Sequence, residues 1–298
     1  MAPDTVDPRR RRGPRTVRVA AAVARHDGTV PEGDTVYRTA ARLHQALAGR
    51  LLTGADFRVP AHATADLSGR RVLDVTPRGK HLLTRFDGDL TLHTHLRMDG
   101  SWELYRTGER WRGGAAHQIR AVLVTAEHTA VGYRLPVVEL LRSADEQRVV
   151  GHLGPDLLGP DWDLAEALCR LTEQPELPLA EALLDQRKLA GIGNVYANEL
   201  CYLAGVTPWT PLGTVPTLDR ILARAHQLLD ANKLRPGHPT TGETRPDRRN
   251  FVYGRARRPC LRCGTAIRTA PHAQGQGRDR PAFWCPRCQH GPAPTVRR

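Results

Sequence analysis

No hydrophobic stretch in the 298-residue sequence approaches the roughly 20 consecutive apolar residues that a membrane-spanning helix requires. The sequence therefore predicts a soluble protein with no membrane partner. It also lacks a recognisable secretory signal, and without one its six cysteines do not indicate a disulfide framework. We expect a location in the reducing cytoplasm.

Acidic residues are scarce relative to basic ones. The chain has 31 Asp and Glu against 44 Lys and Arg, which gives a formal charge of +13 and a pI near 10.2. Such a surplus favours a polyanionic partner, although an arginine-rich proteome would produce the same bias in an ordinary soluble protein. The length is enough for roughly two domains, each with its own core.

The spacing of apolar residues divides the first half of the chain into three parts. Residues 1–30 show neither periodicity nor turn chemistry, so we expect a disordered leader or a stretch that is not translated. Apolar positions at helical spacing predict a helix from Asp34 to Gly49. Short apolar runs between Gly and Asp turns follow from Arg71 to Leu141. We predict an α+β protein whose N-terminal domain, residues 31–150, is an antiparallel β-sandwich.

The second half is predicted to be helical. Residues 151–163 repeat Gly-Pro-Asp and suit a rigid linker, and residues 164–249 form a helical domain. Its helices are expected over Leu164–Leu171, Leu179–Lys188, Val195–Leu203 and Leu218–Asn232.

Residues 250–298 contain two Cys-x-x-Cys pairs. Cys260 and Cys263 are separated from Cys285 and Cys288 by residues 264–284, close to the separation of about 15 to 20 residues in paired zinc knuckles. Four thiolates complete a closed tetrahedral site, so the pattern predicts one structural zinc ion in a zinc finger. Two chance pairs or a redox dithiol are the alternatives.

Basic residues surround these cysteines and suit contact with phosphate, although a solvated basic face has the same composition. They are Arg255, Arg257, Arg258, Arg262, Arg268, Arg278 and Arg280.

The segment from Leu183 to Leu200 has the pattern helix, glycine-bearing turn, helix. Gly191 and Gly193 allow a close backbone approach, and Asn194 lies at the start of the second helix, where free amides and the helix dipole attract phosphate. The segment is therefore a candidate DNA-backbone clamp. An ordinary helical hairpin with an Asn cap is the alternative.

This segment resembles the helix-two-turn-helix of the formamidopyrimidine-DNA glycosylase and endonuclease VIII family. Further motifs resemble the same family in the same order, and the resemblance spans nearly the whole chain. They are Pro31-Glu-Gly33 (the catalytic motif), Arg78-Gly-Lys80 (the lysine-bearing turn), His152-Leu-Gly-Pro-Asp156 (the interdomain connection), Val252-Tyr-Gly-Arg255 and Arg280 (the finger).

The resemblance implies a specific chemistry. The amine of Pro31 would attack the sugar C1′ and expel the damaged base, and the resulting iminium would drive strand scission. An α-amine suits this role because its reference pKa is about 7.7 to 8.0. Glu32 would be the general acid or base, and Lys80 would contact phosphate and assist proton transfer. Asn194 and Arg280 would hold the phosphates flanking the extruded nucleotide.

Pro31 is internal in this sequence, and an amide nitrogen is no nucleophile. We therefore expect translation to begin at Val30, read as an initiator methionine that is then removed. A tail that is cleaved later, or a non-catalytic DNA-binding paralogue, are the alternatives.

Three positions bear on the substrate. The family often has a glutamate where this chain has Thr35, which puts that carboxylate's role in doubt. Met98 resembles the apolar residue that fills the gap left by the flipped base, and otherwise belongs to the core. Tyr133-Arg-Leu-Pro136 occupies the region where 8-oxoguanine enzymes have an Asp-Pro-Arg-Arg-Phe-Gly segment. We therefore favour the endonuclease VIII-like branch and oxidised pyrimidines.

His93, His95 and His117 do not predict a second metal site, because no carboxylate or third ligand lies near the first two in sequence. Together these observations predict a bifunctional DNA glycosylase and AP lyase of base excision repair. We expect a monomer that binds damaged double-stranded DNA and associates with the nucleoid. A preference for oxidised purines, a non-catalytic DNA-binding protein and a zinc-ribbon transcription factor are the alternatives.

Overall fold

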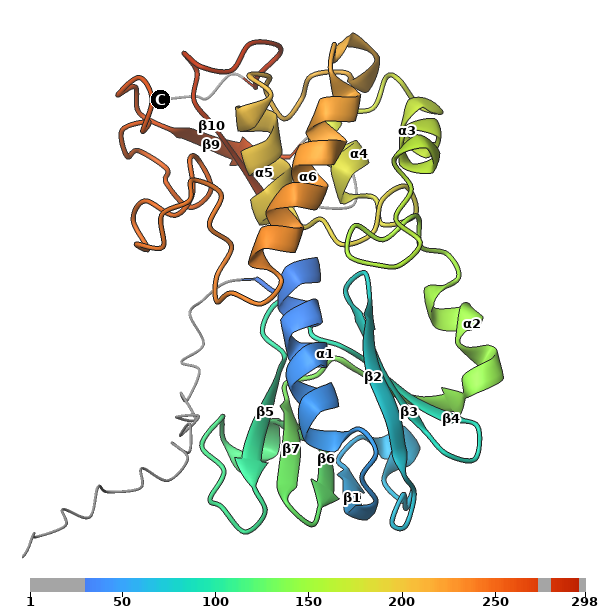
Figure 1. Ribbon diagram of the computed structural model, residues 1–298. Helices are drawn as coiled ribbons and strands as arrows, with labels where there is room; N and C mark the ends of the chain where they lie inside the picture. Colours follow the sequence, from blue (N-terminus) through green and yellow to red (C-terminus); the bar gives the residue numbers. More distant parts are fainter. Residues whose placement is uncertain (1–29, 273–279, 295–298) are drawn as a thin grey trace, which may run out of the picture.

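The computed structural model describes residues 30–272 and 280–294. Two antiparallel sheets and a long helix form one half of the molecule, and a cluster of helices with a small β-hairpin forms the other (Figure 1). This arrangement confirms the predicted α+β class with an N-terminal β-sandwich and a helical C-terminal half. The predicted leader, except Val30, lies outside the described residues.

Each sheet of the first half has four strands, and all pairings are antiparallel. One sheet has the order β1-β6-β7-β5, with β1 (Leu52–Phe57), β6 (Ile119–Thr125), β7 (His128–Tyr133) and β5 (Ser101–Arg106). The other has the order β2-β3-β4-β8, with β2 (Val72–Arg78), β3 (His81–Phe86), β4 (Leu90–His95) and β8 (Val137–Arg142). β1 lies outside the 71–141 region in which strands were predicted.

Helix α1 (Gly33–Leu47) packs against strands of both sheets. Its apolar positions Val36, Ala40, Leu43 and Leu47 recur at helical spacing and are all buried. They share one core with side chains of both sheets, so the helix is fixed relative to the sandwich. The N-terminal end of α1 points toward the helical half (Figure 1), and α1 also contacts α6.

The helices of the second half share a single apolar core. They are α3 (Leu164–Thr172), α4 (Leu179–Leu184), α5 (Asn194–Leu203) and α6 (Leu218–Asn232). Nearly every residue of α5 is buried, because it packs against α4, α6 and the hairpin of β9 (Arg268–Pro271) and β10 (Pro281–Trp284).

Short helices occur at the connections between these elements. They are α2 (Gln147–Val150) and the 3-10 turns η1 (Pro60–His62), η2 (Ala116–Gln118), η3 (Ser143–Asp145) and η4 (Leu212–Thr214). No helix among the described residues is long and apolar enough to cross a membrane.

The helix predicted over Leu179–Lys188 is shorter than expected and ends at Leu184. The next residue, Asp185, has an extended backbone, and its carboxylate accepts the Arg187 N–H at 3.0 Å and pairs with the Arg187 guanidinium at 2.8 Å. An aspartate that bonds to the backbone two residues ahead favours a turn over a further helical residue. The chain between α4 and α5 is therefore free to form the glycine-bearing turn.

Candidate active site

Glu32 is buried at the junction of the two halves. It precedes α1, and its carboxylate accepts hydrogen bonds from backbone amides at the start of α5: Gly193 N to Oε2 at 2.8 Å and Val195 N to Oε1 at 2.7 Å. The N-terminal end of a helix stabilises a negative charge through these free amides and the helix dipole. The carboxylate beside Pro31 is thus fixed by the helical half.

Two glycines make this approach possible. The Gly33 N–H donates to the Gly191 carbonyl at 2.9 Å, and a Cβ on Gly33 would lie 2.9 Å from the Gly191 Cα. A Cβ on Gly193 would lie 2.5 Å from the carboxyl carbon of Glu32. The backbone of the Pro31-Glu-Gly33 segment therefore packs directly against the backbone of the glycine-bearing turn, with no room for a side chain between them.

These bonds correct one sequence-based expectation. The amides at the start of α5 were expected to bind a phosphate. In the structure, the amides of Gly193 and Val195 donate hydrogen bonds to Glu32 instead. The Asn194 side chain also has partners: its Nδ2 donates to the Pro281 carbonyl at 3.0 Å, and its Oδ1 lies 2.9 Å from His272 Nε2. Asn194 thus ties the start of α5 to the β9-β10 hairpin.

Lys80 contacts the same turn. It follows Gly79 in the tight connection between β2 and β3, where Gly79 has a φ of +56°. The Gly79 N–H donates to the Asp156 carboxylate at 2.6 Å, and the Lys80 ammonium donates to the Ile192 carbonyl. Asp156, which lies in the predicted linker, thus holds the lysine-bearing turn against the helical half.

Burial shifts the acid and base strength of both groups. It raises the pKa of Glu32, and the charges of His238 and Lys80 oppose this shift. Burial also lowers the pKa of Lys80 to about 8, with Arg280 adding to the effect and Glu32 opposing it. Glu32 and Lys80 are therefore close enough to influence each other, and each is suited to proton transfer near neutral pH.

Sequence analysis missed a second buried pair, Asp34 and His238. The His238 Nδ1 lies 2.7 Å from Asp34 Oδ2, and the Tyr196 hydroxyl donates to the same oxygen at 2.7 Å. Burial by itself would lower the pKa of His238, but the Asp34 carboxylate and the Glu32 charge raise it to about 8. The only available signal was Asp34 itself, two residues after Glu32, because the loop that carries His238 has no periodic pattern.

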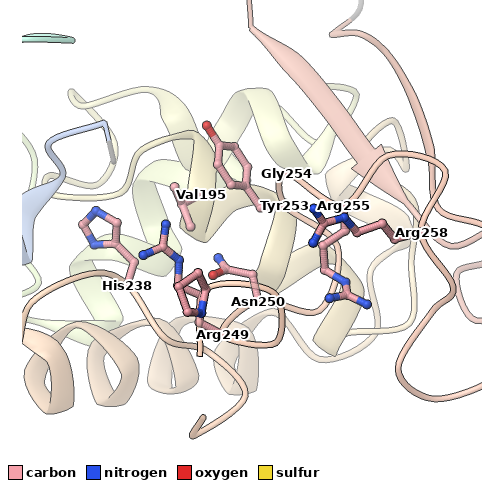
Figure 2. Close-up of a pocket in the computed structure, with 9 residues that line it drawn as sticks. Val195, His238, Arg249, Asn250, Tyr253, Gly254, Arg255 and Arg258 are labelled. Carbon is pink, nitrogen blue, oxygen red and sulfur yellow. The ribbon is translucent and has the colours of Figure 1, made fainter. Parts of the chain in front are cut away.

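A cavity of about 230 Å³ opens beside this pair. Its walls come from the start of α5, the loop after α6 and the segment that leads into the first cysteine pair. Figure 2 shows His238 and Arg249 on one side, Arg255 and Arg258 on the other, and Asn250 between them. The cavity thus combines several hydrogen-bond donors with positive charge.

The remaining predicted DNA contacts are exposed. Met98 is 58% exposed in the turn between β4 and β5, so the alternative that it belongs to the core is wrong. Arg280 is also exposed, and its charge acts on Lys80 and His272. The structure thus gathers Glu32, Lys80 and Arg280 around one junction, while Met98 projects from a separate turn of the sandwich.

The four predicted metal ligands come together. The Sγ atoms of Cys260, Cys263, Cys285 and Cys288 all lie within 4.8 Å of one another. Individual separations are 3.9 Å between Cys260 and Cys288 and 3.4 Å between Cys263 and Cys285, against about 3.8 Å for thiolates around a tetrahedral zinc ion. The Tyr202 hydroxyl lies 3.3 Å from Cys260 Sγ, where a hydrogen bond would orient this sulfur. The cluster is therefore suited to hold a metal ion.

The histidines considered as metal ligands do not form a cluster like that of the cysteines among the described residues. Sequence reasoning placed no carboxylate near His93, but Glu139 from β8 lies 3.4 Å from its Nδ1, and His81 lies 2.8 Å from its Nε2. Burial lowers the pKa of both His81 and His93. The described residues bring no third ligand atom to this group at metal-binding distance, and the exposed His117 is separate from it.

Glu199 is a further buried carboxylate that the sequence did not reveal. It lies on α5 and accepts the N–H groups of Phe251, Val252 and Tyr253 at 2.7 to 2.8 Å, together with the Thr240 hydroxyl. These bonds fix the segment that enters the cysteine cluster. Helix α5 therefore organises both the Glu32 site at its start and the finger along its length.

Comparison with known protein families identifies two matching models. The formamidopyrimidine-DNA glycosylase N-terminal domain matches residues 30–151, and the formamidopyrimidine-DNA glycosylase H2TH domain matches residues 153–231. Together they cover more than half of the chain and contain Glu32, Lys80 and the glycine-bearing turn.

Several relatives are similar over most of their length. Probable endonuclease 8 2 of Streptomyces coelicolor is 63% identical over 267 residues, covering 89% of this chain and 96% of that protein. DNA-(apurinic or apyrimidinic site) lyase Nei2 of Mycolicibacterium smegmatis is 48% identical, covering 87% and 99%. Endonuclease 8 of Escherichia coli is 32% identical, covering 88% and 100%.

The fold also matches solved structures. A Lactococcus lactis formamidopyrimidine-DNA glycosylase bound non-covalently to DNA containing an AP site superposes with a TM-score of 0.72, at 21% identity, over 88% of this chain and 100% of that one. This likeness supports the fold, and the family models and relatives give the family. The chain belongs to the formamidopyrimidine-DNA glycosylase and endonuclease VIII family of DNA glycosylases and AP lyases, on its endonuclease VIII-like branch.

Proposed function

We propose that the protein removes oxidised pyrimidines from double-stranded DNA and nicks the strand, with the amine of Pro31 as nucleophile. The observation that carries this proposal is the buried Glu32 carboxylate, which directly follows Pro31, is bonded to the amides of α5 and interacts with the charge of Lys80. A buried acid, an amine and a lysine of lowered pKa at one junction suit acid-base chemistry at a sugar.

The nucleophile must be a free amine, so the active form begins at Pro31. The neutral nitrogen attacks C1′, and the bond from C1′ to the base breaks with its electron pair leaving on the base. Glu32 accepts the proton of the attached nitrogen and delivers it to the ring oxygen as the ring opens. The raised pKa of Glu32 supports this alternation between base and acid. The resulting iminium drives elimination of the 3′ phosphate.

Positive groups around the junction suit the DNA backbone. Lys80 and Arg280 interact electrostatically with each other, and both lie near the turn that holds Glu32. We assign them, with Asn194, to the phosphates that flank the extruded nucleotide. Met98, exposed on its own turn, is assigned to the gap that the nucleotide leaves in the duplex.

We assign the cavity beside His238 to the extruded base. Val195, whose amide binds Glu32, is part of its wall, so the cavity adjoins the reacting centre. Its volume of about 230 Å³ accommodates a nucleobase, and the Asn250 amide and the exposed Arg258 offer donors to the extra carbonyl and hydroxyl groups of an oxidised pyrimidine.

We assign the four-cysteine cluster to one structural zinc ion. Cys260, Cys263, Cys285 and Cys288 would hold the ion as thiolates, and the ion would supply the cross-link that fixes the hairpin. Because Asn194 bonds to Pro281 on β10, the finger in turn positions the start of α5.

One observation favours a non-catalytic alternative for the 298-residue chain. The carbonyl of Val30 lies 3.2 Å from His238 Nε2, so the peptide bond that blocks the Pro31 nitrogen is itself accommodated in the site. A chain that keeps this bond would bind damaged DNA without cleaving it.

The proposal is tested with duplexes that contain an oxidised pyrimidine or 8-oxoguanine and a chain that begins at Pro31. We expect faster base release from the pyrimidine duplex, and a loss of about 100-fold or more in Glu32→Gln with DNA binding retained. Equal or faster release of 8-oxoguanine would overturn the substrate assignment. Unchanged release in Glu32→Gln would overturn the role of Glu32.

A further inference from the structure

The His238 ring connects a buried carboxylate with the backbone at Pro31. Its Nδ1 lies 2.7 Å from Asp34 Oδ2, and its Nε2 lies 3.2 Å from the Val30 carbonyl oxygen and 3.5 Å from the Thr35 hydroxyl. Both ring edges therefore have partners, and the Nε2 edge faces the peptide bond whose nitrogen belongs to Pro31.

Asp34 is fixed by partners of its own. The Tyr196 hydroxyl donates to Oδ2 at 2.7 Å, the Thr35 N–H donates to Oδ1 at 2.7 Å, and the Asn232 side chain supports the tyrosine hydroxyl at 2.9 Å. Both Asp34 and His238 are buried. A carboxylate that orients an imidazole in this way also stabilises its protonated form.

The partner of Nε2 depends on where the chain begins. In a chain that starts at Pro31, the Val30 carbonyl is absent, and Nε2 loses this partner next to the residue that carries the free amine. We propose that the Asp34–His238 pair takes up the proton of the Pro31 ammonium group and so holds the amine in its nucleophilic form. This inference rests on the proposed function, and it adds a proton-transfer pair that is separate from Glu32 and Lys80.

The step is a simple proton exchange. An N–H bond of the Pro31 ammonium breaks, its electron pair stays on nitrogen, and the proton forms a new bond with the His238 Nε2 lone pair. The product is a neutral amine beside an imidazolium ion whose charge Asp34 balances. Attack on C1′ then proceeds with the regenerated lone pair.

The proton affinities of the two groups are well matched. An α-amine has a reference pKa of about 7.7 to 8.0. Asp34, Glu32 and the Val30 carbonyl raise the pKa of His238 to about 8, against the effect of burial, and in a chain that begins at Pro31 the effects of Asp34 and Glu32 remain. Two adjacent bases of equal strength share a single proton near neutral pH, because placing a second proton creates like-charge repulsion. The neutral amine beside an imidazolium ion is therefore an accessible arrangement near neutral pH.

Other groups around the amine do not replace this pair. Glu32, held by the amides of Gly193 and Val195, accepts a proton only after the nitrogen has attacked C1′, and Lys80 donates to the Ile192 carbonyl. Glu32, Asp34 and Lys80 are the charged groups that act on each other here, and Tyr196 is kept neutral because burial raises its pKa further. Without His238 the two carboxylates would stabilise the ammonium form of Pro31.

The test uses a chain that begins at Pro31 and contains every described helix and strand. We compare unmodified protein with His238→Gln and Asp34→Asn by measuring the rate of borohydride trapping on abasic-site DNA from about pH 5.5 to 9. Each variant should be about 10- to 100-fold slower near pH 6.5 and nearly unchanged near pH 9, because each pH unit restores about tenfold more neutral amine. The acidic limb of the profile thus moves to higher pH.

His117→Gln is the matched control, since His117 is exposed and outside the site. Equilibrium binding to DNA with a stable abasic analogue checks that each variant is folded. If both variants bind this DNA and keep the original rate and pH profile, the pair has no such role. A uniform slowing at every pH would also overturn it, because a purely structural defect does not move the acidic limb. If the unmodified chain is not trapped at all, the proposed function fails instead.

Discussion

The Glu32 carboxylate and the Val195 amide lie 2.7 Å apart although they are separated by 163 positions in the chain. This bond joins the segment before α1 to the first turn of α5, and therefore the sandwich half to the helical half. Because Pro31 is covalently attached to Glu32, the bond also fixes the nucleophile of the proposed reaction. A small change at this contact should therefore affect chemistry more than it affects the fold.

Gly193→Ala tests this contact directly. The added Cβ would lie 2.5 Å from the Glu32 carboxyl carbon, so the carboxylate must move away from the amides of α5. We expect a loss of about 1 to 3 kcal/mol in the free energy of unfolding, as for overpacking in a core, and a much larger relative loss in the rate of base excision. Urea denaturation and single-turnover excision measure the two effects.

Gly54→Ala is the matched control for this prediction. Gly54 lies in β1, its φ is not positive, and a Cβ there meets nothing within 4 Å. It should change neither stability nor excision appreciably. A Gly193→Ala protein that excises as fast as the original would contradict the proposed importance of the Glu32 contact.

The lowered pKa of Lys80 leads us to expect that DNA binding depends on pH. Its folded pKa is lowered to about 8, below the ordinary value of 10.5, so its positive charge is present below pH 8 and is lost as the pH rises through that value. A phosphate contact made by this charge should weaken over the same range. In the 298-residue chain, the slope of log affinity against log salt should decrease by about one between roughly pH 6.5 and 9.5.

Lys80→Arg provides the comparison, because a guanidinium stays charged throughout this range. Its salt slope should be the same at both pH values. The assignment of Lys80 to a phosphate is wrong if the original protein also shows a constant slope, measured by fluorescence anisotropy at several salt concentrations.

The cysteine cluster predicts dependence on zinc. Structural zinc contributes an apparent binding free energy of about 10 to 16 kcal/mol in finger peptides, so removing a ligand should release the metal and loosen the β9-β10 hairpin. Cys260→Ser is expected to lose zinc and to bind DNA at least about tenfold more weakly, since the hairpin holds Asn194.

Cys169→Ser is the control for this prediction, since Cys169 is exposed on α3 and apart from the cluster. It should keep one equivalent of zinc by mass spectrometry and the original DNA affinity. Purified protein that carries another metal in stoichiometric amount, and binds DNA equally well, would contradict the assignment of zinc.

The features that sequence analysis predicted well are those with a local signature. The Cys-x-x-Cys pairs need only their spacing to indicate a shared metal, and α1 shows its buried face through Val36, Ala40, Leu43 and Leu47. Glu32 and Lys80 were reached through motifs that resemble one family. Helix α5 was placed within one residue because a glycine-bearing turn precedes it.

The features it missed depend on contacts between distant positions. His238 meets Asp34 across 204 positions, and it lies in a loop whose Pro, Gly and Thr content carries no period. Glu199 lies among the residues of an ordinary helix, and only the fold shows that it accepts three amides of the finger segment. The Glu32 bonds to α5 were likewise invisible, so the amides at that helix start were wrongly left open for a phosphate.

The most direct test of the account is borohydride trapping on duplex DNA with an abasic site, comparing a chain that begins at Pro31 with the 298-residue chain. We expect a covalent adduct with the shorter chain and none with the longer one, because only a free Pro31 amine forms an iminium. Mapping the adduct by mass spectrometry should place it on Pro31. Binding without trapping in both chains, or an adduct on a lysine, would contradict proline catalysis.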